Sequence, residues 1–233
     1  MTGGDLRKGR EQKGWTQEEA ATRLGVSQPY LSLLEKELRR VPENLARKAA
    51  SAFRLSAVTL PVETGWNEVQ TKSEDTLAAD LAALGYPGFS HLKGSRKKNP
   101  AQVLLSALSA QDLNSRLTEA LPWVLLSYPD LDWDSLVKEV KVRDLQNRLG
   151  FLTSVARRLA EKQGDIEKAN WLRLKETSLE RSRLVLEDTL CHDSLTKAER
   201  RWLDRVRSEE AKYWRLLTDL KPDHLSYASG TTS

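Results

Sequence analysis

The chain has 233 residues, of which 39% are hydrophobic and 30% are charged. This composition is typical of a globular protein with a proper core, built as one large domain or as a small domain and a larger one. Its one cysteine, Cys191, excludes a disulfide within the chain, and no apolar run follows the N-terminus as in a secretory signal. No stretch approaches the roughly 18 apolar residues of a membrane span. We therefore expect a cytoplasmic protein without a membrane partner.

The positive charge is confined to one end of the chain. Residues 1–60 contain 11 Lys and Arg against 7 Asp and Glu, whereas residues 61–233 contain 26 of each, so the formal net charge of +4 comes from the N-terminal quarter. A basic module of this kind favours a polyanionic partner. Four extra charges are equally compatible with an ordinary solvated surface, so the charge by itself leaves both interpretations open.

The first 60 residues contain the signals of four helices. A short helix is predicted at 5–13, and Thr16 begins a capping box that predicts a second helix, which ends at Gly25. Ser27 is the predicted cap of a third helix, and Pro42 begins a fourth. The side chains expected to face inward from the last three helices are Ala20, Ala21, Leu24, Leu31, Leu34, Leu38, Leu45, Ala49, Ala52 and Phe53.

The remainder of the chain is also predicted to be helical. Residues 61–99 are interpreted as a linker with a connecting helix at 74–84, residues 100–225 as a helical bundle, and residues 226–233 as a flexible tail. No sustained apolar alternation or hairpin turn indicates a strand. The helices expected in the bundle lie at 100–109, 113–127, 133–146, 147–163, 166–190 and 196–220.

The two longest predicted helices, 166–190 and 196–220, are expected to form an antiparallel hairpin. Such a hairpin would be a surface for dimerisation or for a partner protein. The first of them has leucines on repeating turns, at Leu172, Leu179, Leu186 and Leu190. Most tryptophans of the C-terminal part are expected in the core, with some available as interface anchors; they are Trp123, Trp133, Trp171, Trp202 and Trp214.

One segment has a recognisable pattern. Thr16–Glu35 reads TQEEAATRLGVSQPYLSLLE, which resembles the Xre/Cro/C1-type helix-turn-helix of phage repressors and many bacterial regulators. The resemblance covers residues 5–60. It implies a lambda-repressor-like domain that binds double-stranded DNA, so the expected fold class is all-α, with this helix-turn-helix domain followed by a C-terminal helical bundle.

The helix after the turn would present its first residues to the base edges of the major groove. Gln28 can form a bidentate pair with adenine, and Pro29 offers an apolar contact to a thymine methyl group. In the family that this segment resembles, the position of Gln17 bonds a phosphate, which the dipole of its helix also favours. The remaining candidate contacts are hydroxyls at Ser27, Tyr30 and Ser32, and cations for phosphates at Lys36, Arg39 and Arg40.

Leu33 departs from the family pattern, in which a long polar or basic side chain often follows the position of Ser32. Leu33 is interpreted either as a contact to a thymine methyl group or as part of a protein surface. Glu35 is expected to buttress the domain or to repel wrong DNA. Domains of this kind bind palindromes about one helical turn apart as dimers, so the expected partner is a palindromic operator and the expected state is a homodimer.

No set of residues predicts an enzyme. The three histidines, His91, His192 and His224, lack the spacing of a metal site, and neither Gly-rich phosphate-loop motif occurs. The run Cys191–His192–Asp193 is interpreted as a helix end with an incidental cysteine, because neighbouring helical side chains point about 100° apart and cannot align as a triad. We expect no enzymatic activity, no metal and no cofactor.

Three functions are compatible with this layout. In the first, the bundle neutralises a toxin enzyme and the protein represses its own operon; residues 120–133 and 142–152 resemble antitoxins encoded beside nucleotidyltransferase-like toxins. In the second, the protein is a stand-alone dimeric regulator whose bundle senses an effector or dimerises. The third is an enzyme with DNA targeting. The basic cluster at 93–98 is interpreted as a solvated loop, as a second contact to DNA or RNA, or as a partner site.

Overall fold

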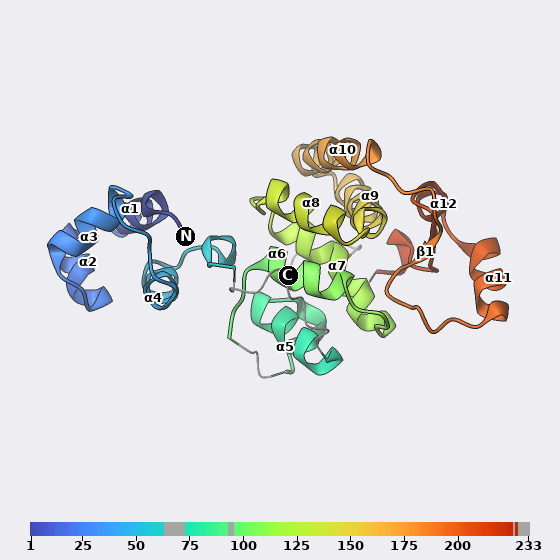
Figure 1. Ribbon diagram of the computed structural model, residues 1–233, viewed down its shortest axis with the longest axis horizontal. Helices are drawn as coiled ribbons and strands as arrows, with labels where there is room; N and C mark the ends of the chain where they lie inside the picture. The colour runs from blue at the N-terminus through green and yellow to red at the C-terminus, as the bar shows by residue number, and fades with distance from the viewer. Residues whose placement is uncertain (63–72, 93–95, 226, 228–233) are drawn as a thin grey trace. The chain divides into compact units, whose positions relative to one another are not determined.

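The computed structural model describes residues 1–62, 73–92, 96–225 and 227, and the chain divides into two units (Figure 1). The first comprises Met1–Trp66 with Lys97–Asn99, and the second comprises Asn67–Arg96 with Pro100–Ser233. Apart from Tyr227, the tail predicted at 226–233 lies outside the described residues. The expected fold class is confirmed: both units are helical, with a helix-turn-helix arrangement in the first and a helical bundle in the second.

In its described residues, the first unit has four α-helices and one 3-10 turn. The first helix begins two residues earlier than predicted, because Thr2 and Asp5 form a capping box in which each side chain bonds the backbone N–H of the other. The predicted capping box of Thr16 and Glu19 begins the second helix, and Gly25 ends it in the left-handed region at a φ of 73°. The elements are α1 (Gly3–Gln12), α2 (Gln17–Leu24), α3 (Gln28–Glu35), α4 (Glu43–Phe53) and η1 (Ala57–Thr59).

The predicted apolar faces meet in one core, with a single exception among the leucines. Leu38 was expected to face inward but is 68% exposed, because α3 ends at Glu35 and Glu37 turns the chain with a φ of 58°. Trp15 packs edge-on against Phe53 at 5.7 Å between ring centroids. The buried members of the core are Leu6, Ala20, Ala21, Leu24, Leu31, Leu34, Leu45, Ala49 and Phe53.

The second unit is built around α9, in which every residue from 146 to 156 is buried. This helix packs against α7, α8 and α10, and Figure 1 shows α10 and α5 on opposite sides of the unit. Trp214 is fully buried against it, whereas Trp202 is 54% exposed and is not a core residue. The elements up to this point are α5 (Glu74–Leu84), η2 (Pro87–Phe89), α6 (Pro100–Leu108), α7 (Ser115–Ser127), α8 (Trp133–Val142), α9 (Gln146–Lys162) and α10 (Ile166–Glu180).

The two long C-terminal helices and their hairpin were predicted wrongly. Beyond α10 the chain forms short elements, of which β1, α11 and α12 lie together at one end of the unit (Figure 1). Among them are two strands that pair in parallel, with Asp188 opposite Leu216 and Thr189 opposite Leu217, although no strand was expected. These elements are β1 (Asp188–Thr189), α11 (Lys197–Val206), α12 (Glu209–Tyr213), β2 (Leu216–Leu217) and η3 (Pro222–His224).

Polar side chains of α9 explain why the chain leaves the helix after α10. Asn147 bonds both backbone groups of Leu184, accepting from its N–H at 2.8 Å and donating to its C=O at 3.1 Å. Arg148 forms a bidentate pair with Asp188, at 2.7 and 2.9 Å. These contacts hold the chain extended towards β1, and Leu186, which was expected on a helical stripe, is 80% exposed.

Candidate nucleic-acid interface

The two helices of the candidate interface are positioned by their own caps and by the turn between them. The hydroxyl of Thr16 accepts from the N–H of Glu19 at the start of α2, and the hydroxyl of Ser27 accepts from the N–H of Tyr30 at the start of α3. The hydroxyl oxygen of Ser27 is therefore used as a helix cap, whereas its O–H group can still donate a hydrogen bond. Leu31 and Leu34 anchor α3 in the core, which leaves Gln28 and the neighbouring Pro29 exposed at its first turn.

Gln17 and Gln28 were both predicted as DNA contacts, and the structure brings them together. The Nε2 of Gln28 donates to the Oε1 of Gln17 at 2.7 Å, and the Nε2 of Gln17 donates to Glu35 at 2.9 Å. Gln17 is half-buried between the two partners. The first residue of α2 and the first residue of α3 are thus linked into one unit with defined donors and acceptors.

The anchor of this pair is a buried ion pair. The carboxylate of Glu35, whose side chain is 3% exposed, accepts from the Nε and Nη2 of Arg10 at 2.7 and 3.1 Å. Arg10 also donates to the C=O of Trp15 at 3.0 Å. The hydrogen bond that Arg10 donates to Glu35 raises the pKa of the Arg10 guanidinium, which favours its charged form.

Sequence reasoning did not include Arg10 in the site. In the sequence, Arg10 is one basic residue of the first helix. Its partner Glu35 lies 25 residues away, so no local pattern indicates that the two form a pair. Glu35, by contrast, was expected as a buttress. It lies under Gln17, and the chain Arg10–Glu35–Gln17–Gln28 runs from α1 through the core to the exposed start of α3.

The other predicted contacts surround this pair on α3 and the turn that follows it. Tyr30 and Ser32 are half-buried, and Arg39 lies over the Tyr30 ring at 5.8 Å from its centroid. Lys36, Arg39 and Arg40 are exposed. Leu33, which departs from the family pattern, is half-buried on the same helix. The contacts of all these residues with DNA remain predictions.

The run Cys191–His192–Asp193 lies in the loop between β1 and α11, not at the end of a helix as expected. Cys191 has a φ of 54°, and its thiol donates to the C=O of Ala107 at 3.3 Å. Burial raises the pKa of this thiol to about 11. Asp193 accepts from the hydroxyl of Thr189 at 3.0 Å. These contacts give Cys191 and Asp193 structural roles.

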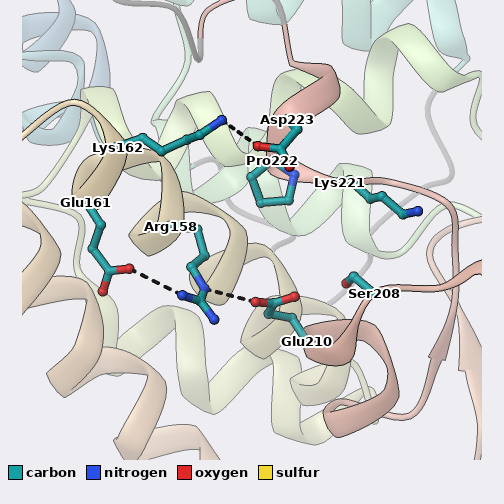
Figure 2. Close-up of a pocket in the computed structure, with 8 residues that line it drawn as sticks. All are labelled: Arg158, Glu161, Lys162, Ser208, Glu210, Lys221, Pro222 and Asp223. Carbon is teal, nitrogen blue, oxygen red and sulfur yellow. Dashed lines mark hydrogen bonds and ion pairs between the residues drawn. The ribbon is translucent and has the colours of Figure 1, made fainter.

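The second unit also has an open cleft of about 530 Å³ between the end of α9 and the segment around η3 (Figure 2). Arg158 pairs there with Glu210 at 2.9 Å and with Glu161 at 3.8 Å, and Lys162 pairs with Asp223. Figure 2 shows the charged groups of these pairs turned towards one another, whereas the amine of Lys221 points away from them. They hold α9, α12 and η3 together, and each cation in these pairs is matched by an anion.

Within the described residues, no cluster of three or more His, Cys, Asp or Glu side chains could hold a metal ion. In the same part of the chain, no helix has both the length and the apolar character needed to cross a membrane.

The comparisons with known proteins concern the first unit. Residues 6–60 match the family model described as helix-turn-helix. No curated protein and no solved structure matches the chain. The matched residues contain both capped helices, the Gly25 turn and the buried pair beneath the two glutamines. Residues 6–60 therefore form a helix-turn-helix domain of the Xre/Cro/C1 type, the DNA-binding domain of a transcriptional regulator.

Proposed function

We propose that the protein is a repressor that binds a palindromic operator as a homodimer, with α3 in the major groove. The observation that supports this proposal is the set of hydrogen bonds made by Gln17 and Gln28. The amide of Gln28 uses one N–H on Gln17, which leaves its second N–H and its oxygen for the N7 and N6 of an adenine. Gln28 is held in position before DNA arrives, so its base contact requires little reorganisation.

The hydrogen bonds of Gln17 likewise leave one of its donors for a phosphate contact. Its oxygen accepts from Gln28 and one N–H is donated to Glu35, so one N–H remains for a phosphate oxygen. It is also the first residue of α2, where the helix dipole favours an anion. Lys36, Arg39 and Arg40 would bind further phosphates on the other side of α3.

The test begins with selection of preferred sites from random duplexes by the full chain. On the selected site, Gln28→Ala is expected to weaken binding by about 1–3 kcal/mol, or roughly 5- to 150-fold, with a much smaller effect on random DNA. Gln12→Ala is the matched control, because Gln12 is exposed at the end of α1. An equal loss on selected and random DNA would show that Gln28 does not read bases.

For the second unit, we propose that it binds a toxin enzyme and that the protein represses its own operon. The support is the resemblance of residues 120–133 and 142–152 to antitoxins. Most of the apolar side chains in these segments are buried, including Leu121, Val124 and Phe151. The resemblance therefore concerns the interior of the unit and hence its fold. The alternative is a stand-alone regulator whose second unit dimerises or binds an effector.

Purification of the tagged full chain from its native cell separates the two versions. A stoichiometric enzyme partner whose growth inhibition is relieved by coexpression of the chain supports the antitoxin role. Recovery of the chain alone, as a dimer by light scattering, supports the stand-alone regulator. A monomer both with and without a palindromic duplex contradicts the proposed homodimer.

A further inference from the structure

A second cavity of the second unit lies where α11, β2 and the start of α7 meet. Its volume is about 440 Å³, and Figure 1 shows α11 at the end of the unit beside β1 and α12. Small-molecule sites are typically apolar cavities of about 300–1,000 Å³ with a few polar groups in their walls. The apolar lining of this cavity consists of leucines from several segments, which are Leu113, Leu190, Leu195, Leu203 and Leu217.

One wall of this cavity is formed by Trp202. This side chain is 54% exposed, more than any other aromatic side chain in the described residues. It has no hydrogen bond, ring contact or cation contact with another described residue. An indole ring attracts a cation to its face, and its N–H can donate a hydrogen bond. An exposed tryptophan beside an apolar lining is therefore suited to an organic cation.

Two carboxylates line the same cavity without a cationic partner. The Oε2 of Glu199 accepts from the N–H and the hydroxyl of Thr196, at 2.7 and 2.6 Å, which leaves Oε1 available. The hydrogen bond from the Thr196 hydroxyl lowers the pKa of Glu199, which favours its charged form. Asp219 is exposed just beyond β2. Neither carboxylate forms an ion pair with a described residue.

The rest of the lining adds no permanent positive charge. Among the described residues, no lysine or arginine lines the cavity, and its one base is the imidazole of His192, which accepts a hydrogen bond when neutral. The exposed cations of α11 fall on the opposite side of the helix from Glu199, because successive side chains turn by about 100°; they are Lys197, Arg201 and Arg205.

The cleft in Figure 2 shows the difference between charges that hold the fold and charges that are left over. There Arg158 and Lys162 are paired with carboxylates across the cleft, so those carboxylates are already neutralised. The carboxylates of Glu199 and Asp219 hold no element in place through an ion pair. Their charge is available to a ligand.

We propose that this cavity binds a small organic cation, an amine or a guanidine with an apolar body. Its charged head would lie among Glu199, Asp219 and the ring of Trp202, while its body covers the leucines. The inference goes beyond the proposed operator binding and depends on neither DNA nor a partner protein. It gives the second unit a ligand of its own.

The experiment compares probes that share one body and differ in the head group. Phenylethylamine is a cation at neutral pH, phenylethanol is neutral and phenylacetate is an anion; hexylamine adds an amine with a flexible body. Calorimetric titration of the full chain is expected to give a dissociation constant of about 1 mM for the better amine. Phenylethanol should bind at least about fivefold more weakly than phenylethylamine, and phenylacetate should not bind detectably.

A double variant removes the two charges. Glu199→Gln/Asp219→Asn keeps the start of α11, because glutamine also completes a capping box. It should weaken amine binding by about tenfold and leave the binding of phenylethanol unchanged. The matched control is Asp134→Asn/Glu167→Gln, which removes two exposed carboxylates from α8 and α10. It should leave the binding of both probes unchanged.

A variant of the tryptophan locates the binding. Trp202→Leu keeps an apolar wall but removes the ring, so amine binding should weaken by about threefold or more. The chain has seven tryptophans, and the indole N–H signal that is missing from the nitrogen–proton spectrum of Trp202→Leu belongs to Trp202. In the wild type, that signal should shift as the amine is added.

Several outcomes would overturn the inference. These are equal affinity for phenylethylamine and phenylethanol, unchanged amine binding in Glu199→Gln/Asp219→Asn, an amine that leaves the Trp202 signal in place, and failure of both amines to bind at about 20 mM. Loss of a dimer in Trp202→Leu, with no amine bound by the wild type, would show that a second copy of the chain covers the cavity. Operator binding is measured on duplex DNA and stands or fails separately.

Discussion

Replacement of Glu35 by glutamine tests whether the buried ion pair positions Gln17 and Gln28, the two glutamines that we propose contact DNA. The carboxylate accepts three hydrogen bonds, two from Arg10 and one from Gln17, at 2.7, 3.1 and 2.9 Å. Glu35→Gln keeps the shape of the side chain but removes its charge and replaces one acceptor by a donor. Arg10, whose side chain is 12% exposed, would then keep only the exposed carboxylate of Glu11 at 3.7 Å as a charged partner, and Gln17 would face a second amide.

The magnitude follows from the burial of the pair. Removal of one partner of a buried ion pair typically costs about 3–5 kcal/mol. Arg10 keeps its bond to the C=O of Trp15 and the new amide keeps one acceptor, so we expect a loss of about 2–3 kcal/mol in the stability of the first unit. Operator affinity should fall by about tenfold, or 1.4 kcal/mol, because Gln17 and Gln28 lose their fixed orientation.

Urea unfolding of the full chain, followed through the transition of the first unit, measures the stability, and operator affinity is measured where the variant remains folded. Glu18→Gln, an exposed change on α2, is the control and should change neither quantity. The double variant Arg10→Met/Glu35→Leu separates the two roles. An apolar pair can restore the stability, but it offers Gln17 no acceptor, so the affinity should remain low. Full operator affinity in Glu35→Gln or in the double variant would refute the positioning role.

Three further outcomes are expected. Gly150→Ala should destabilise the second unit by about 1–3 kcal/mol in chemical unfolding, although alanine favours a helix, because the new Cβ would lie 2.4 Å from the ring of Trp214; a more stable variant would show that the ring moves away freely. Cys191 should react with a thiol reagent at pH 8 only after unfolding, since a pKa of about 11 leaves roughly 0.1% thiolate; rapid labelling of native protein would contradict its burial. Arg39→Ala should weaken binding to operator and random DNA about equally and lower the salt slope by roughly one; an unchanged slope would remove Arg39 from the phosphate contacts.

The helices of the first unit could be predicted because their signals are local. Thr16 and Glu19 are three residues apart, Gly25 supplies its own left-handed turn, and Ser27 bonds a backbone N–H three residues on. The exposed residues of the interface followed from the same pattern, since a capped helix with a buried leucine stripe must present its first turn to solvent. The failure at Leu38 was local too: nothing in the leucine spacing showed that Glu37 would turn the chain.

The buried half of the site could not be predicted in the same way. Arg10 and Glu35 are 25 residues apart, and each alone is an ordinary charged residue on a helix. Their pairing depends on α1 and α3 packing against each other, which is a tertiary fact. The sequence therefore predicted the exposed groups that are proposed to contact DNA and a buttressing role for Glu35, while the partner of Glu35, Arg10, became visible only in the fold.

The C-terminal region shows the same division on a larger scale. Repeating leucines favoured one helix from 166 to 190, and the pattern is correct as far as Leu179, which is fully buried. Beyond it, Asn147 of α9 supplies to the backbone of Leu184 hydrogen bonds that a continued helix would have made within itself, and Arg148 binds the side chain of Asp188. A helix is preferred only while its backbone has no better partner. These partners lie 37 and 40 residues away in the sequence. Hydrophobic periodicity therefore overestimates the length of a helix wherever a buried polar side chain of another element bonds the residues that follow the helix.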